Sequence, residues 1–363
     1  MPDLSALKSR LHAALFDLAG MGHEGVEDRL NAIYAPDAAW RGSHPMNEAR
    51  GAAGIAEVLW RPLFRAFPDL ERRDSIFVAG RSIHDPERPV RVAAMGHLLG
   101  TFKEPWLGIP PTGGAVFLRY GEVHEVDAEG RIARTSLLLD VLDVMRQAGV
   151  WPLAPSLGTE EMWPAPITGD GLRLDQTDEE AGEASIRQTL AMHQALADYQ
   201  DEGEGGQSRE RLIAMPQRDH WHPKMMWYGP AGIGTSRGLE GFVDVHQLPF
   251  RIGLPGRKGG ATLNEAKDAD GGGHYLQIGD GPYSVTGGWP SVRAVHRGGD
   301  WLGLPPTDRP VSMRVMDFYL HHEGLIRENW VPIDMIDVLR QLGVDVMGRV
   351  KTMTGLRAPI GRV

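Results

Sequence analysis

Apolar residues recur at helical spacing early in the chain, and the pattern changes to strand-like runs further on. Leucines between residues 4 and 18 fall three or four positions apart, which predicts an amphipathic helix over 3–19. Two more helices are predicted over 26–34 and 51–67, the second with a kink or end at Pro62. The segments that predict strands are 75–79, 90–99, 115–126 and 132–139. A short helix over 140–147, ended by Gly149, closes this half.

The same order of elements returns in the second half. Residues 153–178 are rich in Pro, Gly and Thr, which is typical of a linker. After it, the pattern predicts helices over 180–199 and 238–250, an extended segment at 220–228, Gly-rich turns and strands as far as 330–333, and a last helix over 334–342. Helices followed by a run of antiparallel strands predict an α+β fold in each half.

Two sequence blocks occur twice and show that this order is a duplication. WLGIPPT at 106–112 returns as WLGLPPT at 301–307 with six of seven residues identical, and DVLDVMRQAGV at 140–150 returns as DMIDVLRQLGV at 334–344 with seven of eleven. The offsets are 195 and 194 residues, so the register holds between the blocks. Nearer the start of each half, matching positions lie 187 apart: Arg50, Gly51, Gly54, Pro62 and Pro68 match Arg237, Gly238, Gly241, Pro249 and Pro255. Repeats of this size are tandem domains.

The repeat sets the expected domain boundaries. Domain 1 covers residues 1–152 and domain 2 covers 179–350, with the linker at 153–178 and a tail at 351–363. Extra residues in the second half fall around 256–273 and 292–299. The two related domains are expected to form an intramolecular pseudo-dimer that packs sheet to sheet, and a homodimer is a further alternative.

Composition narrows the function classes. The net charge of −10 and the lack of a polybasic run argue against nucleic-acid and anionic-membrane partners. The absence of cysteine excludes disulfides, thiolate catalysis and Cys-based zinc sites. No apolar run approaches the roughly 18 residues of a membrane span, and the N-terminus reads as an amphipathic helix. We expect a soluble cytoplasmic protein without nucleic-acid or membrane partners.

Several motifs resemble one family. WYGPAGIG at 227–234, HQLPF at 246–250, GGWPS at 287–291, WLGLPPT, and ENWVPID followed by LRQLG are similar to SnoaL-like polyketide cyclases of the nuclear-transport-factor-two-like superfamily. The resemblance covers most of 180–350 and, more loosely, 20–150. It implies two cone-shaped domains, each a curved antiparallel sheet wrapped around helices, with a deep apolar pocket. Family members include cofactor-free aldol cyclases, and relatives include isomerases, dehydratases, hydrolases and binding modules, so the fold alone does not define a reaction.

The resemblance implies an aspartate as general acid and base, carried by motif onto Asp334 and, in the first half, Asp140. A carboxyl among apolar walls has a raised pKa suited to proton transfer. The alternative is structural, because each aspartate precedes a helix and is followed three residues later by Asp337 or Asp143, as in an N-cap with an acidic first turn. His246 is a candidate second proton-transfer group, or else a hydrogen-bonded structural histidine.

A set of aromatic and polar residues is predicted to bind the substrate. Domain 2 holds more tryptophans than domain 1, which suits a flat apolar ligand, although tryptophans also fill small cores. The predicted substrate-binding residues are Trp227, His222, Trp289, Trp301, Arg314, Trp330, Asn329 and Tyr283. On the strand at 311–320, alternation places Asp317 and Tyr319 on one face and Arg314 on the other, and leaves open which face lines the pocket.

These observations support three functional hypotheses. The first is a cofactor-free enzyme that acts on an apolar carbonyl compound, a cyclase or alternatively an isomerase, dehydratase or hydrolase, with no metal and with Asp334 as proton shuttle. His220 and His222 share a strand face but lack a matching carboxylate, which makes a metal site a weak alternative. The second is a non-catalytic small-molecule-binding protein, and the third is a scaffold in which one half is a degenerate partner of the other.

Overall fold

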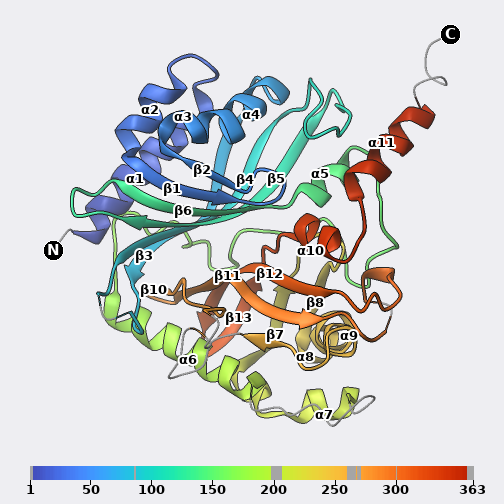
Figure 1. Cartoon of the computed structure of the whole chain (residues 1–363). Helices are drawn as coiled ribbons and strands as arrows, with labels where there is room; N and C mark the ends of the chain where they lie inside the picture. The colour runs from blue at the N-terminus through green and yellow to red at the C-terminus, as the bar shows by residue number, and fades with distance from the viewer. Residues whose placement is uncertain are drawn as a thin grey trace.

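The chain folds into two α+β units of the same design, which confirms the predicted fold class. The computed structural model describes residues 3–85, 87–197, 207–259, 267, 271–299 and 301–357. In Figure 1 the first unit, coloured blue to green, lies above the second, coloured yellow to red, and their sheets face each other across the middle of the molecule.

The first unit wraps a six-stranded sheet around its helices. Its helical elements are α1 (Leu4–Gly20), α2 (Val26–Ile33), α3 (Gly51–Ile55), a π-helical turn (Ala56–Trp60), α4 (Arg61–Ala66) and α5 (Val141–Gln147). Its strands are β1 (Tyr34–Gly42), β2 (Glu48–Arg50), β3 (Glu71–Arg81), β4 (Val90–Thr101), β5 (Ala115–Val126) and β6 (Ile132–Leu139). The sheet order is β2-β1-β6-β5-β4-β3, antiparallel except for the parallel pair of β1 and β6.

The second unit repeats this order with one interruption. Its helical elements are α6 (Glu179–Ala197), α7 (Arg209–Ala214), a 3-10 turn (Pro216–His220), α8 (Gly238–Phe242), a π-helical turn (Val243–Gln247), α9 (Leu248–Gly253), a 3-10 turn (Trp301–Gly303), α10 (Met335–Gln341) and α11 (Val346–Arg357). Its strands are β7 (Trp221–Tyr228), β8 (Thr235–Arg237), β9 (Lys258–Gly259), β10 (Ile278–Asp280), β11 (Tyr283–Val295), β12 (Pro310–His322) and β13 (Leu325–Trp330). The order β10-β11-β12-β13-β7-β8 matches the first sheet, and β9 also pairs with β11.

Local sequence explains where the helices begin and bend. The Asp3 carboxylate caps α1 by accepting from two backbone N–H groups of the first turn. The predicted helix at 51–67 is instead two short helices joined by the π-helical turn, and Pro62 lies in the first turn of α4, where its missing N–H costs nothing. The predicted helix at 238–250 is divided in the same way, and Pro249 occupies the equivalent place in α9.

The outer faces of the two sheets pack against each other and form an apolar layer distinct from the interior of each cone. Val78, Met95 and Val123 of the first sheet join Phe318, Leu320 and Trp330 of the second in one buried cluster. Both faces of β12 are therefore buried, one against the other unit and one inside its own cone.

A buried ion cluster fastens the two units and the linker at one edge. Asp280 of β10 binds Lys8 of α1 at 2.5 Å and Arg173 of the linker at 3.2 Å. The same carboxylate accepts the backbone N–H groups of Ala79 and Asp178. Lys8 and Asp280 are fully buried, so loss of the Asp280 charge would leave Lys8 without its ion-pair partner in a dry environment.

Gly121 marks a close approach of the two sheets and gives a testable prediction. A Cβ atom on Gly121 would lie 2.6 Å from Cγ of Pro332 and 3.1 Å from Cε2 of Phe318, both in the second unit. Gly121→Ala is expected to lower the free energy of unfolding by about 1–3 kcal/mol, because a proline ring and a packed phenylalanine cannot yield without moving backbone. Urea unfolding measures this loss.

Gly20→Ala is the matched control, since nothing lies within 4 Å of its added Cβ. An equal loss in both variants would contradict a tight fit between the sheets at Gly121.

Candidate functional site

The second unit encloses a cavity of about 610 Å³ between the inner face of its sheet and its helices. Strands β7, β12 and β13 supply one wall, and α6 with the segment α8–α9 supplies the other. The cavity-lining residues on the inner face of β12 are Met313, Val315, Asp317 and Tyr319. Alternation along β12 thus directs Asp317 and Tyr319 into the cone and Arg314 toward the first unit.

Among the described residues that line this cavity, Asp317 is the only one with a carboxylate. Burial raises its pKa to about 7, although hydrogen bonds from Asn329 and Tyr319 lower it in part. The Asn329 side-chain amide donates to the Phe318 carbonyl at 3.2 Å and lies 3.5 Å from the Asp317 carboxylate. A carboxyl with a pKa near 7 is part ionised at neutral pH, so it can both accept and return a proton.

The buried His274 and the half-buried His193 complete the polar end of the cavity. Nδ1 of His274 lies 3.5 Å from the Asp317 carboxylate and 3.0 Å from Oγ1 of Thr286. Nε2 of His193, on α6, hydrogen-bonds the Tyr319 hydroxyl at 2.9 Å. Burial lowers the pKa of His193 to about 4 and, together with the neighbouring His193, lowers that of His274 well below its usual value. Both imidazoles are therefore neutral near pH 7.

Tyr319 is a hydrogen-bond donor at the same end of the cavity. Burial, with the nearby Asp317 charge, raises the pKa of its hydroxyl well above the ordinary value, so the hydroxyl keeps its proton. The site thus holds one titrating carboxyl, one protonated phenol and neutral imidazoles, without a permanent charge among these groups. Such a set can transfer a proton and stabilise a developing oxyanion by hydrogen bonding.

An aromatic wall forms the other end of the cavity. His246 stacks on Trp227 with ring centroids 4.4 Å apart and on Phe250 at 5.2 Å. Burial, and secondarily Arg257 and Arg251, lower the pKa of His246 to about 3. Nδ1 of His246 has no hydrogen-bond partner among the described residues. His246 is thus a neutral, stacked side chain near pH 7, and the proton-transfer role expected of it stays a prediction.

Three of the residues predicted to form the site line the cavity: Trp227, His246 and Asn329. The remaining predicted residues lie elsewhere. His222 is near the surface and faces Glu323 at 3.5 Å, Trp301 packs behind Phe250, and Trp330 stacks on Tyr228 between the two sheets. Tyr283 donates to Asp170 of the linker at 2.5 Å. These aromatic residues belong to the packed layers around the cavity.

Trp289 and Arg314 belong to the contact between the units. The Trp289 ring lies 5.0 Å from the guanidinium groups of both Arg41 and Arg314. Arg314 binds the Asp334 carboxylate at 2.9 Å. Neither residue is among those that line the cavity, and the substrate contact expected of them stays a prediction.

Asp334 and Asp140 also are not among the residues that line the cavity, and the general acid and base role expected of them stays a prediction. Asp334 caps α10 by accepting from the N–H of Asp337, and it accepts the N–H of His44 in the first unit at 2.8 Å. Asp140 caps α5 and accepts the N–H of Ala231 in the second unit at 2.9 Å. His44 and Ala231 are 187 positions apart, so the two contacts are equivalent.

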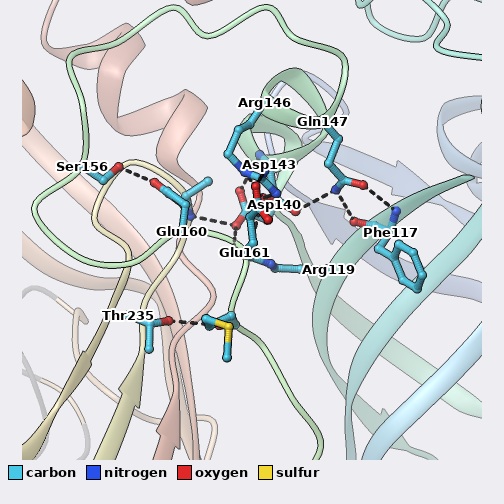
Figure 2. Close-up of polar contacts among 12 residues, drawn as sticks. Phe117, Arg119, Asp140, Asp143, Arg146, Gln147, Ser156, Glu160, Glu161 and Thr235 are labelled. Atoms are coloured by element: carbon cyan, nitrogen blue, oxygen red, sulfur yellow. Dashed lines mark hydrogen bonds and ion pairs between the residues drawn. The ribbon is translucent and has the colours of Figure 1, made fainter. Parts of the chain in front are cut away.

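Each of these aspartates is paired with an arginine of its own unit. Figure 2 shows Asp140 beside Asp143 and Arg119, with Arg146 and Gln147 closing the network. Burial raises the pKa of Asp140 to about 6 against the opposing Arg119 charge, and burial also raises that of Asp334. The capping alternative considered for these residues therefore describes their contacts, and the raised pKa values arise from burial in the contact between the units.

The sequence did contain a signal for the residues that were missed. Asp317 is the single charge in the run VMDFYL, and Tyr319 shares its face. His274 and His193 could not be linked to them, because they come from a Gly-rich segment and a helix far apart in sequence. Among the described residues, no group of three His, Asp or Glu side chains is arranged to hold a metal ion. None of the helices within the described ranges is long and apolar enough to cross a membrane.

The fold and the cavity define the chain as two fused cone-shaped α+β domains of which the second encloses an acid-lined pocket. The family model for SnoaL-like polyketide cyclases matches residues 12–148 and 289–342, together more than half of the chain. The chain belongs to the SnoaL-like polyketide cyclase family, as the sequence motifs indicated.

Individual relatives are distant. Structures similar to part of the chain include a SnoaL-like polyketide cyclase from Jannaschia sp. CCS1, described as putative (22% identity, 40% of this chain and 93% of that chain, TM-score 0.31). A second is IdmH from Streptomyces antibioticus, also described as a putative polyketide cyclase (23% identity, 39% of this chain and 99% of that chain, TM-score 0.30). A third is TsrD from Streptomyces laurentii (21% identity, 41% of this chain and 99% of that chain, TM-score 0.33). No curated protein matches the sequence significantly.

The raised pKa of Asp317 predicts a pH-dependent effect on stability. Its pKa of about 7 in the folded chain exceeds the unfolded value near 3.9, so the folded state binds the extra proton and this group destabilises the fold as pH rises from about 4 to 7. Asp317→Asn removes that penalty. The stability of the variant relative to wild type should therefore increase between pH 5 and pH 8, by on the order of 2–3 kcal/mol in urea unfolding.

Asp17→Asn, at an exposed position on α1, controls for the loss of a carboxylate and should show no such trend. A stability difference for Asp317→Asn that is the same at both pH values would show that this carboxyl titrates normally.

Proposed function

We propose that the cavity of the second unit is the active site of a cofactor-free enzyme that removes and returns a proton on carbon next to a carbonyl group. The observation that carries the proposal is the Asp317 carboxyl, which is buried in the cavity wall with a pKa near 7 and contacts from Asn329, Tyr319 and His274. Much of the remaining wall is apolar, with Gln247, Arg251, Arg257 and Lys258 among its polar members, which suits a largely apolar substrate that carries a polar group.

The proton transfer balances without an oxidant or reductant. The ionised Asp317 takes a proton from the carbon, and the electrons of the C–H bond form the enolate. The Tyr319 hydroxyl, held by His193, donates a hydrogen bond to the enolate oxygen. In a cyclisation the enolate carbon would form a C–C bond with a second carbonyl of the same molecule, and the new alkoxide would take the proton from Asp317.

Family membership favours cyclisation over simple isomerisation as the outcome. The same first step serves an isomerase or a dehydratase, in which the proton returns to another carbon or a hydroxyl group leaves. A binding protein without turnover is the second candidate, favoured by the extensive aromatic wall around His246. The two differ in whether the carboxyl exchanges protons with a bound ketone.

Deuterium exchange into 2-tetralone tests the proposal, because this probe is an apolar bicyclic ketone with acidic protons next to its carbonyl. Wild type should accelerate loss of these protons in D₂O, followed by ¹H NMR, and Asp317→Asn should lower the enzyme-dependent rate by about 10²–10⁴-fold. The rate should rise with pH around the Asp317 pKa of about 7.

Asp334→Asn is the matched control, because it alters a buried carboxylate outside the cavity and its amide oxygen can still accept an N–H. Its exchange rate should stay within about twofold of wild type. Saturable binding of 2-tetralone without enzyme-dependent exchange would favour the binding protein, and equal rates in wild type and Asp317→Asn would remove Asp317 from the mechanism.

A further inference from the structure

The first unit has a counterpart for each main residue on the sheet side of the cavity. The repeat offset of 195 places Glu122 at the position of Asp317 and His124 at that of Tyr319. Strand pairing agrees, because His124 pairs with Thr135 as Tyr319 pairs with Asn329. Inside the first cone, the acid and its neighbours therefore recur at the same places on the sheet.

In the first unit, a buried arginine side chain lies beside Glu122, the counterpart of Asp317. Arg72 of β3 binds Asp74 at 2.7 Å and Glu122 at 2.6 Å, and its guanidinium lies 4.8 Å from the ring of Tyr120. His124 lies 3.1 Å from Glu122, and His12 of α1 lies 3.3 Å from Asp74. Arg72 and Glu122 are 3% and 5% exposed, so the cluster is closed to solvent.

The carboxylates of this cluster have lowered pKa values, whereas the carboxyl in the cavity of the second unit has a raised one. Burial opposes ionisation of Glu122, but the Arg72 charge, with the neighbouring His124, brings the pKa of Glu122 down to about 2. Burial likewise acts against ionisation of Asp74, and the ion pair with Arg72 nevertheless holds the pKa of Asp74 below its usual range. Both carboxylates are therefore fixed anions at neutral pH, unlike Asp317.

Backbone pairing identifies what the second unit has in place of Arg72. Arg72 pairs with Leu98 on β4, and Leu98 pairs with Leu118. The equivalent positions in the second unit are Val292 and Met313, which pair with each other, and the partner of Val292 on its other side is Gly259. Gly259 lines the cavity. A glycine thus stands where the first unit places its buried guanidinium group.

We infer that the interior of the first unit is a closed copy of the second unit's cavity, in which the Arg72 guanidinium serves as a built-in ligand for Asp74 and Glu122. The same place should accept a small planar cation of the guanidinium class once that side chain is removed. The inference uses the position of the second unit's cavity, and it does not depend on the reaction proposed there. It also implies that the first unit holds no second active centre.

Chemical rescue of Arg72→Ala in the full chain tests this inference. The substitution removes the arginine that two buried carboxylates share and leaves only histidines beside them as basic groups, so the melting temperature should fall markedly. Methylguanidinium chloride at about 10 mM should raise the melting temperature of the variant by about 3–6 °C relative to equimolar NaCl, and it should not raise that of wild type. No rescue beyond NaCl would overturn the inference.

Arg73→Ala is the matched control, because Arg73 is the adjacent residue on β3 and its side chain is 65% exposed. It should show neither the large loss nor the rescue, and equal rescue in both variants would show a nonspecific effect of the cation. If Arg72→Ala does not fold alone, refolding with and without methylguanidinium tests the same point: recovery only with the cation supports the built-in ligand, and no recovery under either condition overturns it.

Exchange of 2-tetralone in folded Arg72→Ala separates this inference from the proposed function. Its rate should remain within about twofold of wild type, because Arg72 lies outside the second unit. If wild type shows no exchange at all, the proposed reaction fails while the rescue result still decides the role of Arg72.

Discussion

The two units are held in register by a reciprocal pair of hydrogen bonds from backbone N–H groups to carboxylates. Asp140 of the first unit accepts from Ala231 of the second, and Asp334 of the second accepts from His44 of the first. Each carboxylate also caps its own helix and pairs with its own arginine. Because both aspartates are buried, a shift of one unit against the other would leave desolvated charges and amides unsatisfied. This constraint fixes which faces of the sheets meet, and so which faces remain inside each cone.

The fold could be predicted from the sequence because the duplication presents the same order of helices and strands twice. Helical periodicity, turn residues and the repeated blocks gave the element order, the α+β class and the family. The main error was to predict one continuous helix at 51–67 and one at 238–250, where the structure has π-helical turns at 56–60 and 243–247. A π-helical turn widens the helix by about one residue, which changes the apolar pattern too little to be recognised in the sequence.

The site was harder to predict because burial has two causes in this molecule. One face of β12 is buried in a cavity wall and the other against the sheet of the first unit, so alternation identifies two apolar faces and cannot distinguish them. Asp334 and Asp317 are both buried acids near apolar residues, and only three-dimensional contacts separate a helix cap in an interface from a carboxyl in a cavity. His274 reaches Asp317 through chain that follows the extra residues of the second unit, and no local pattern encodes that approach.

The interruption between β9 and β10 has a consequence for how the two halves could diverge. In the first unit a single strand, β3, occupies the positions equivalent to both β9 and β10. Its Arg72 side chain lies inside the cone. In an assembly of identical subunits, a residue that closes the cavity of one subunit closes the cavity of every subunit. A closed cavity and an open cavity could then not coexist. Joining the copies in one polypeptide removes that symmetry requirement. One half is then free to keep a closed interior in which Arg72 is bound between two carboxylates, while the other half keeps an interrupted strand and a cavity with a buried acid.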